Sequence, residues 1–177
     1  MDFKNFPTKE YEIKRYSEHN NDVNDVRYQN FVSPIVNEVL KDFTPKNFGL
    51  DFGCGTGPVI TKLLRDKDYP ITTYDPFFHN NLEALNKSYS FIVCCEVIEH
   101  FHNPLKEFKL LKSLLKPNGK LYCMTDLFSE TINFKTWYYK DDHTHVIFYH
   151  KNTIRWLKEF LGFSKATVNN RLIIFEV

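Results

Sequence analysis

Apolar residues fall into short continuous runs that alternate with stretches of helical spacing. The runs at residues 48–52, 70–74 and 90–97 are rich in β-branched and aromatic side chains, as strands are. The run at 90–97 is continuous, which is typical of a strand buried on both faces. After the first run, residues 59–64 follow helical spacing. The first half of the chain therefore predicts alternating strands and helices.

The second half continues this alternation up to residue 125. Asn103 before Pro104 predicts a helix start, because Asn caps a helix and proline fits its first position. The helix is expected to end at residues 117–119, where Pro, Asn and Gly follow one another. Residues 120–125 then predict another strand.

The C-terminal residues have a different pattern. Asn152 or Thr153 is expected to cap a helix that stops at Gly162. Two strand-like runs follow, joined by Asn169–Asn170, a pair that tolerates the positive φ of a tight turn. Together these patterns predict an α/β fold: a mostly parallel sheet flanked by helices, with a C-terminal antiparallel hairpin.

Three segments carry weaker patterns. Residues 1–22 are polar and predict an irregular arm. Residues 23–40 predict one or two helices with a break or kink at Pro34. Residues 127–150 combine many aromatic residues with three histidines and show little periodicity, which indicates a lid or an insertion.

Length and charge narrow the function classes. A chain of 177 residues has the size of one domain, so we expect a single domain over residues 1–177, of which 1–45 are the N-terminal arm and helices. Lys plus Arg number 23 against 22 for Asp plus Glu, which argues against nucleic acid as a partner. Four cysteines without a CxxC pair, and the lack of a signal-type or long apolar stretch, predict a reduced, cytoplasmic protein without a membrane span.

A glycine-rich turn carries the clearest chemical signal. Gly53, Gly55 and Gly57 lie between a predicted strand and a predicted helix, where bare backbone can approach a ligand. Pro58 follows Gly57, so the Gly-Lys-Ser/Thr of a triphosphate loop and the last glycine of a dinucleotide fingerprint are both missing. Asp75 ends the second strand, where a carboxylate can accept both hydroxyls of a ribose. The turn predicts a ribose-bearing ligand without pyrophosphate.

Four features that follow one another along the chain carry a family resemblance: DFGCGTG, Asp75, CCEVIEHFHNP and LLKPNGKLYCMT. Together they resemble the class I S-adenosylmethionine-dependent methyltransferases over residues 48–126. A small subgroup of that family is similar over most of the chain. The similarity lies in four segments: TYDPFF, EVIEHFHNP, WYYKDDHTHVIFY and RYSEHNNDVNDVRYQNF. The resemblance implies a Rossmann-like, shortened class I fold and S-adenosylmethionine as the cofactor. It also implies cofactor contacts from Asp51, Gly53, Cys54, Gly55, Gly57, Asp75, Cys95 and Glu96.

The sequence departs from the family between residues 75 and 90, which are too few for the usual helix and strand. We infer that Pro76, Phe77 and Phe78 sandwich the adenine and that part of the ordinary sheet is missing. The subgroup resemblance implies that His19 and its neighbours in the N-terminal arm cover the cofactor; on residue patterns alone an exposed arm fits equally well.

Methyl transfer from a sulfonium requires a nucleophile held in line with the departing sulfur, and often a base that removes its proton. His100 follows a buried strand at the rim where ligands bind, although a loop-fixing role suits it too. Asp142 and His145 suit a carboxylate-oriented base, or a polar staple that holds the aromatic segment closed.

A metal site is the third possibility, because His143 and His145 would share one side of a strand. No nearby cysteine or glutamate pattern completes a tetrahedral set, so no metal is expected. We expect methylation of a small molecule at oxygen, nitrogen or carbon. The alternatives are an RNA or protein methyltransferase and a non-catalytic cofactor-binding subunit. The sequence predicts no oligomeric state.

Overall fold

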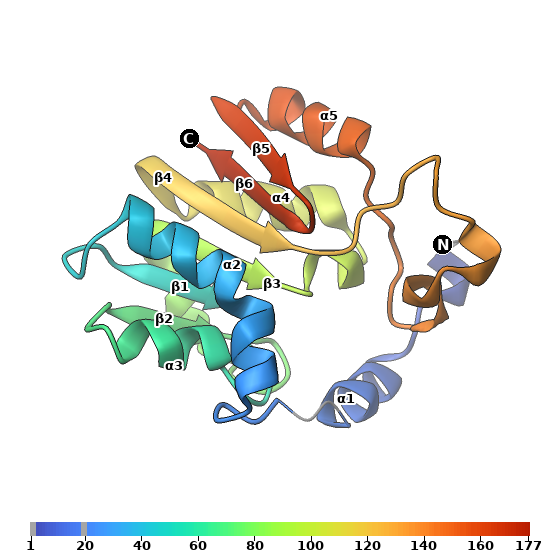
Figure 1. Cartoon of the computed structure of the whole chain (residues 1–177), viewed down its shortest axis with the longest axis horizontal. Helices are drawn as coiled ribbons and strands as arrows, with labels where there is room; N and C mark the ends of the chain where they lie inside the picture. The colour runs from blue at the N-terminus through green and yellow to red at the C-terminus, as the bar shows by residue number, and fades with distance from the viewer. Residues whose placement is uncertain (1–2, 19–20) are drawn as a thin grey trace.

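A computed structural model describes residues 3–18 and 21–177, and a six-stranded sheet forms its centre (Figure 1). The strands are β1 (Gly49–Phe52), β2 (Ile71–Tyr74), β3 (Tyr89–Cys95), β4 (Leu115–Met124), β5 (Lys165–Asn169) and β6 (Leu172–Glu176). Their order in the sheet is β2-β1-β3-β4-β6-β5. The first four strands run parallel, whereas β6 is antiparallel to both β4 and β5. The predicted α/β fold with a C-terminal hairpin is confirmed.

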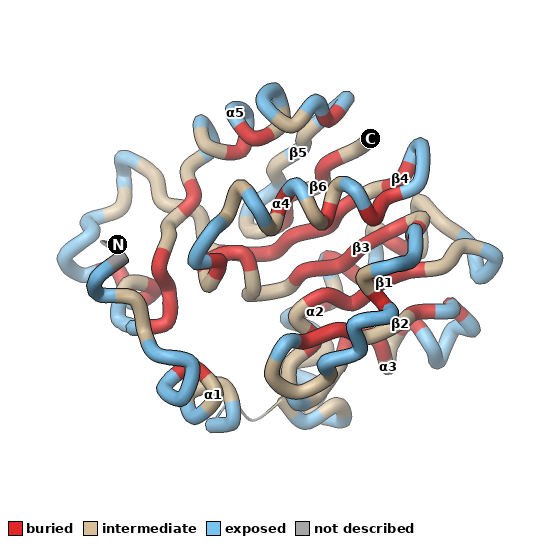
Figure 2. Tube along the Cα trace, turned by 180° about the vertical axis from the view of Figure 1, so that it is seen from behind, coloured by how far each residue is buried: buried red, intermediate tan, exposed pale blue. Residues whose placement is uncertain are grey.

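Helices cover both faces of this sheet (Figures 1 and 2). The helices are α1 (Lys9–Ser17), α2 (Val26–Asp42), α3 (Val59–Arg65), α4 (Pro104–Ser113) and α5 (Lys151–Leu161). In β3, Phe91 and Val93 pack under α2 and α3, while Ile92 and Cys94 pack under α4 and α5. Successive side chains of a strand point to opposite faces, so both faces of β3 need apolar residues. This explains the continuous apolar run at 90–97.

The N-terminal segment differs from the expectation. Residues 1–22 were predicted to be irregular, but Lys9–Ser17 form α1, whose N-cap Thr8 accepts a hydrogen bond from the Tyr11 N–H at 3.3 Å. The helix has no apolar stripe to reveal it, and its one buried residue is Glu12.

The predicted break at Pro34 is wrong, because α2 runs continuously through that residue. Proline has no N–H to donate to the carbonyl of Asn30, one turn earlier. The Ser33 hydroxyl donates to that carbonyl instead, at 2.7 Å. The carbonyl therefore keeps a partner and the helix continues.

Between β2 and β3 the chain forms only a short 3-10 helix at Leu82–Asn86, as its length predicted. β2 is therefore an edge strand. Residues 127–150 form two 3-10 helices, Phe134–Thr136 and Tyr138–Asp141, and no strand. His143 and His145 consequently do not alternate along a strand, contrary to the geometry considered for a metal pair.

Two details at the C-terminal end also differ. His150 caps α5 by accepting from the Asn152 N–H at 3.1 Å, in place of Asn152 or Thr153. The hairpin turns at residues 170–171, and Asn170 takes the positive φ of 52°. Gly162 ends α5 in the left-handed conformation, as expected.

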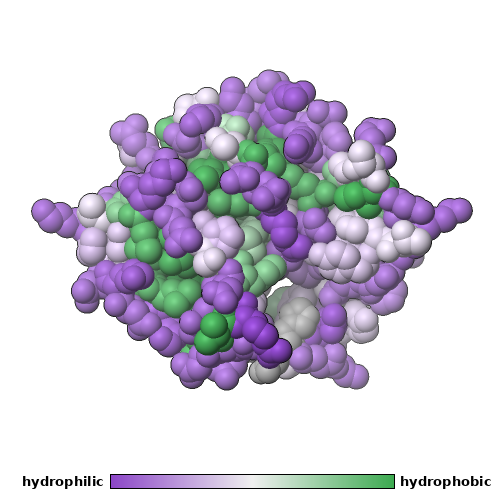
Figure 3. Space-filling view, viewed as in Figure 1, coloured by the Kyte–Doolittle hydropathy of each residue, from purple (hydrophilic) through white to green (hydrophobic). Residues whose placement is uncertain are grey.

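Hydrophilic side chains cover most of the face in Figure 3, with apolar patches scattered between them. Among the described residues, none of the helices has both the length and the apolar character that a membrane crossing requires.

Candidate active site

A cavity of about 960 Å³ opens at the carboxyl ends of β1, β2 and β3. Ligands of open α/β sheets bind at this edge, because the strand-to-helix loops there leave backbone groups exposed. Residues of α1 and of the segment 138–145 form the other walls. Two unlike regions border the cavity: a glycine turn (residues 53–57) and an acid–histidine cluster (Glu96, Glu99, His100 and His145), of which Gly57 and Glu99 lie behind the wall.

The glycine turn has a backbone that other residues would strain or block. Gly53 and Gly55 have φ values of +76° and +62°, which favour glycine. A Cβ on Gly57 would lie 1.7 Å from the backbone oxygen of Asn21. Gly53 and Gly55 line the cavity, whereas Gly57 packs against the segment that precedes α2.

Asp51 lies behind the turn and does not line the cavity. Its side chain is buried and accepts a hydrogen bond from the Thr61 hydroxyl at 2.7 Å. Burial raises the pKa of Asp51 to about 6, from its usual value of 3.8. Of the described residues predicted to contact the cofactor, Asp51 and Gly57 lie outside the cavity wall: Asp51 is bonded to Thr61 of α3, and Gly57 packs against Asn21.

Asp75 organises the loop after β2. One carboxylate oxygen accepts the N–H groups of Phe77 at 2.8 Å and Phe78 at 3.1 Å, and the other accepts the Gly55 N–H at 3.1 Å. A carboxylate has about four lone-pair positions, so one of them remains for a ligand. Asp75 joins the glycine turn to the loop that carries the two phenylalanines.

The acid–histidine cluster begins where β3 ends. Glu96 has a positive φ of 51°, uncommon for a residue with a side chain, and Arg171 donates to its carboxylate at 2.6 Å. The Tyr139 hydroxyl lies 3.1 Å from Glu96 and also contacts Glu99. It has one hydrogen, so it donates to one carboxylate at a time.

Burial raises the pKa of both carboxyls, and for Glu96 repulsion from Glu99 adds to the effect. Glu96 Oε1 and Glu99 Oε2 have no hydrogen-bond partner among the described residues. A buried acceptor without a partner lowers the stability of the fold. The cluster therefore holds two hydrogen-bond acceptors that the described chain does not use.

The two histidines of the cluster are held by backbone carbonyls. His100 Nδ1 lies 2.9 Å from the oxygen of Thr144, and His145 Nδ1 lies 2.7 Å from the oxygen of Tyr139. Their rings are 4.9 Å apart in an edge-on arrangement. Burial and then the neighbouring His100 lower the pKa of His145 to about 4, so its imidazole is neutral near pH 7.

Asp142 is arranged differently from the expected carboxylate–histidine pair. Its carboxylate accepts from the Thr144 N–H at 3.0 Å and from Arg15 at 2.9 Å, and no hydrogen bond joins it to the His145 ring in the described structure. Burial alone would raise the pKa of Asp142, but these hydrogen bonds outweigh it and hold the pKa below the usual range. Asp142 fixes Thr144, whose carbonyl holds His100.

Helix α1 forms one wall of the cavity. Arg15 pairs with Asp142 at 2.9 Å, and Glu12 contacts His102 Nε2 at 3.0 Å. The Tyr16 ring lies 5.1 Å from the His100 ring. Arg15 and Glu12 were not among the site residues predicted from the sequence. Their spacing of three, which places both on one side of a helix, was the signal that could have identified them.

Most predicted site residues lie in the cavity wall. They are Gly53, Cys54, Gly55, Asp75, Pro76, Phe77, Cys95, Glu96, His100, Asp142 and His145. His19 lies outside the described residues. Glu99 and Arg171 were not predicted: Glu99 directly precedes the predicted His100 but carried no separate signal, and no spacing connects Arg171 to the site.

A family model described as a methyltransferase domain matches residues 25–168. The chain belongs to the class I S-adenosylmethionine-dependent methyltransferases. The fold of this methyltransferase is also that of a SAM-dependent methyltransferase from Archaeoglobus fulgidus, with a TM-score of 0.66 and 15% identity over 84% of this chain and 94% of that one. PigF with SAH has a TM-score of 0.59 at 12% identity, over 93% and 68% of the two chains. The predicted family and cofactor are confirmed.

Two sequence relatives of the methyltransferase are named ubiquinone biosynthesis O-methyltransferase. The protein of Actinobacillus pleuropneumoniae serotype 5b (strain L20) is 36% identical over 58 residues, which are 33% of this chain and 25% of the relative. That of Histophilus somni (strain 2336) is 35% identical over 72 residues, 40% of this chain and 28% of the relative. The similarity thus spans about a quarter of each relative.

Proposed function

We propose that this methyltransferase transfers the methyl group of S-adenosylmethionine to a hydroxyl of a small molecule bound in the same cavity. The observation that carries the proposal is the wall that α1 adds to the cavity, which Arg15 joins to Asp142. A volume of about 960 Å³ lies within the range of small-molecule sites. The match to proteins named O-methyltransferase supports oxygen as the acceptor atom.

The glycine turn and Asp75 form the cofactor part of the cavity in this proposal. The remaining lone pair of Asp75 accepts a ribose hydroxyl, and Gly53 and Gly55 let the amino-acid part approach the backbone. Pro76 and Phe77, in the wall beside Asp75, contact the adenine.

His100 and His145 form the acceptor part. The acceptor oxygen attacks the methyl carbon with a lone pair, and the carbon–sulfur bond breaks with its electrons left on sulfur. The hydroxyl proton passes to a base. We assign that role to Glu96, which lines the cavity together with the two imidazoles. Asp142 is a positioning residue, because it holds Thr144 and thereby His100.

Calorimetry with S-adenosylhomocysteine tests the cofactor part. Asp75→Ala is expected to weaken binding at least tenfold, because it removes three hydrogen bonds of the loop together with the ribose acceptor. Asp66→Ala, an exposed carboxylate at the end of α3, is the matched control and should bind as the wild type does. Equal affinity of the two variants would contradict the assignment.

Transfer of a labelled methyl group to fractions of a cell extract tests the acceptor. Label is expected in the small-molecule fraction. Label confined to RNA or to protein would support a macromolecular acceptor instead. Binding of the cofactor without transfer to any fraction would support the non-catalytic subunit.

A further inference from the structure

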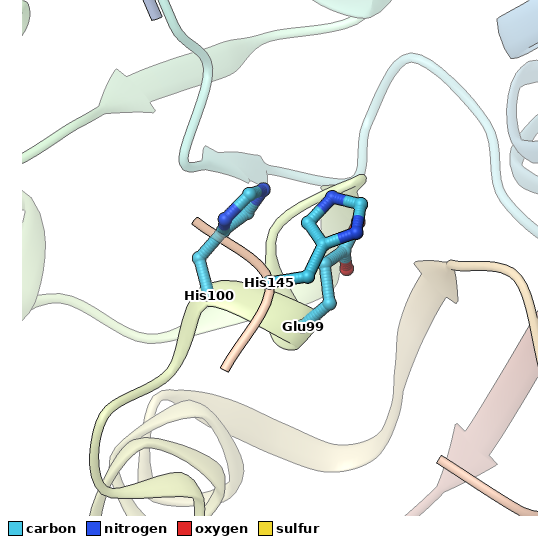
Figure 4. A group of neighbouring side chains, drawn as sticks. All are labelled: Glu99, His100 and His145. Carbon is cyan, nitrogen blue, oxygen red and sulfur yellow. The ribbon is translucent and has the colours of Figure 1, made fainter. Parts of the chain in front are cut away.

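We propose that Glu99, His100 and His145 bind a divalent metal ion in the wall of the cavity. One possible ligand atom from each lies within 4.8 Å of the others, and Figure 4 shows the two imidazoles close to the Glu99 side chain. Around an ion with bonds of about 2.1 Å, opposite ligands lie about 4.2 Å apart and adjacent ones about 3.0–3.4 Å apart, so the side chains have to move together by about half an ångström or more when the ion binds.

The two imidazoles are held as metal-binding histidines are. A backbone carbonyl can only accept, so the contacts to Thr144 and Tyr139 place the hydrogen of each ring on Nδ1. In the neutral form of each ring, Nε2 is then the nitrogen with the lone pair. Metal-ligating histidines generally donate their other N–H to such a carbonyl or carboxylate, which fixes the tautomer and the ring orientation.

Glu99 supplies the third ligand and a separate indication of an ion. Its side chain is fully buried, and Oε1 contacts the Tyr139 hydroxyl. Oε2 has no hydrogen-bond partner among the described residues. A buried carboxylate oxygen in that state loses its solvation without replacement, and a cation between Glu99 and the imidazoles provides the missing interaction.

The ligand types indicate the class of ion. Two imidazoles and one carboxylate suit a divalent first-row cation and leave coordination positions open. His100 and His145 line the cavity, so the open positions face the acceptor part. There the ion would bind the acceptor oxygen and lower its pKa, a role that rests on the proposed function, whereas the binding of the ion does not.

This site revises the expectation of no metal. That expectation rested on the absence of a nearby cysteine or glutamate pattern beside His143 and His145 in the sequence. The fold brings His145 to the Glu99–His100 pair, while His143 remains exposed.

Calorimetric titration of the chelator-treated full chain with Mn²⁺ and with Zn²⁺ tests the site. One ion per chain is expected for at least one of the two metals. Glu99→Gln, His100→Gln and His145→Gln should each weaken its binding at least tenfold, and the matched control His143→Gln should leave it unchanged. Thermal unfolding shows whether each variant is folded. If Glu99→Gln does not fold, the two histidine variants still test the site.

Three results would overturn the proposal: no binding of either ion, binding that the three substitutions leave unchanged, or equal weakening by His143→Gln. Binding of S-adenosylhomocysteine is measured on the same samples. Cofactor binding without metal binding refutes the metal site alone. Metal binding without methyl transfer to small molecules refutes the proposed function alone.

Discussion

The glycine turn and the acid–histidine cluster border the same cavity, yet they are stabilised in different ways. In the glycine turn, Asp51 and Asp75 accept hydrogen bonds from groups no more than 20 residues away. In the cluster, Glu96 is bonded by Tyr139 and by Arg171, 43 and 75 residues away, and two buried carboxylate oxygens have no partner in the described chain. The carboxylates at the turn find their partners nearby in the sequence, whereas the cluster keeps two buried oxygens that the described chain does not bond.

The largest effect is expected at the glycine turn. In Gly57→Ala the new Cβ would lie 1.7 Å from the Asn21 backbone oxygen, so backbone has to move. We expect a loss of about 3 kcal/mol in the free energy of unfolding, measured by urea denaturation. Gly55→Ala is the control: its Cβ approaches only the Asn21 side chain, at 3.4 Å, and its cost is the left-handed φ, about 1–2 kcal/mol. Equal losses would remove the distinction between the two glycines.

The next effect tests the long-range bonding of the cluster. Arg171→Met leaves Glu96 without its cation, and the free energy of unfolding is expected to fall by about 2 kcal/mol, less than for a fully buried pair because Arg171 is partly exposed. Adding Glu96→Gln should recover part of the loss, since the unpaired charge is then absent. A double variant no more stable than Arg171→Met would contradict this account.

A pH dependence is expected from Asp51 behind the glycine turn. Its pKa is about 6 in the folded protein against a usual value of 3.8, so the folded state binds the proton more tightly. The free energy of unfolding should therefore fall as the pH rises from about 4 to 6 and stay lower above that, by roughly 2 kcal/mol. Asp51→Asn removes this contribution, and the stability difference between variant and wild type, measured from pH 4 to 8, should grow in favour of the variant. A difference independent of pH would show that Asp51 does not titrate in this range.

The smallest effect is expected at the ion pair between α1 and Asp142 in the cavity wall. Arg15→Ala removes a partly exposed ion pair with Asp142, so the free energy of unfolding should fall by less than about 1 kcal/mol, and by less still at high salt. Arg27→Ala, which removes an exposed pair at the start of α2, is the control. A loss as large as that of Arg171→Met would make α1 as important to stability as the cluster.

Sequence alone predicted the strands of the sheet better than the two N-terminal helices. The apolar runs identified β1, β2 and β3, because a parallel sheet covered on both faces requires continuous apolar strands. Helix α1 was missed, since its contacts to the cavity are polar and produce no hydrophobic period. A break at Pro34 was wrongly predicted, because the Ser33 hydroxyl that bonds the Asn30 carbonyl is visible only in the folded helix.

By itself, the sequence determined the order of strands and helices, the family and the position of the glycine turn. Each depends on neighbouring residues: the period of apolar side chains, and the conformations that only glycine adopts without strain. The tertiary structure alone decided that Glu99 and His100 meet His145, that Tyr139 and Arg171 hold Glu96, and that Arg15 pairs with Asp142. These contacts join segments far apart in the chain, and no spacing in the sequence encodes them, because only the packing of the loops at the carboxyl edge of the sheet brings them together.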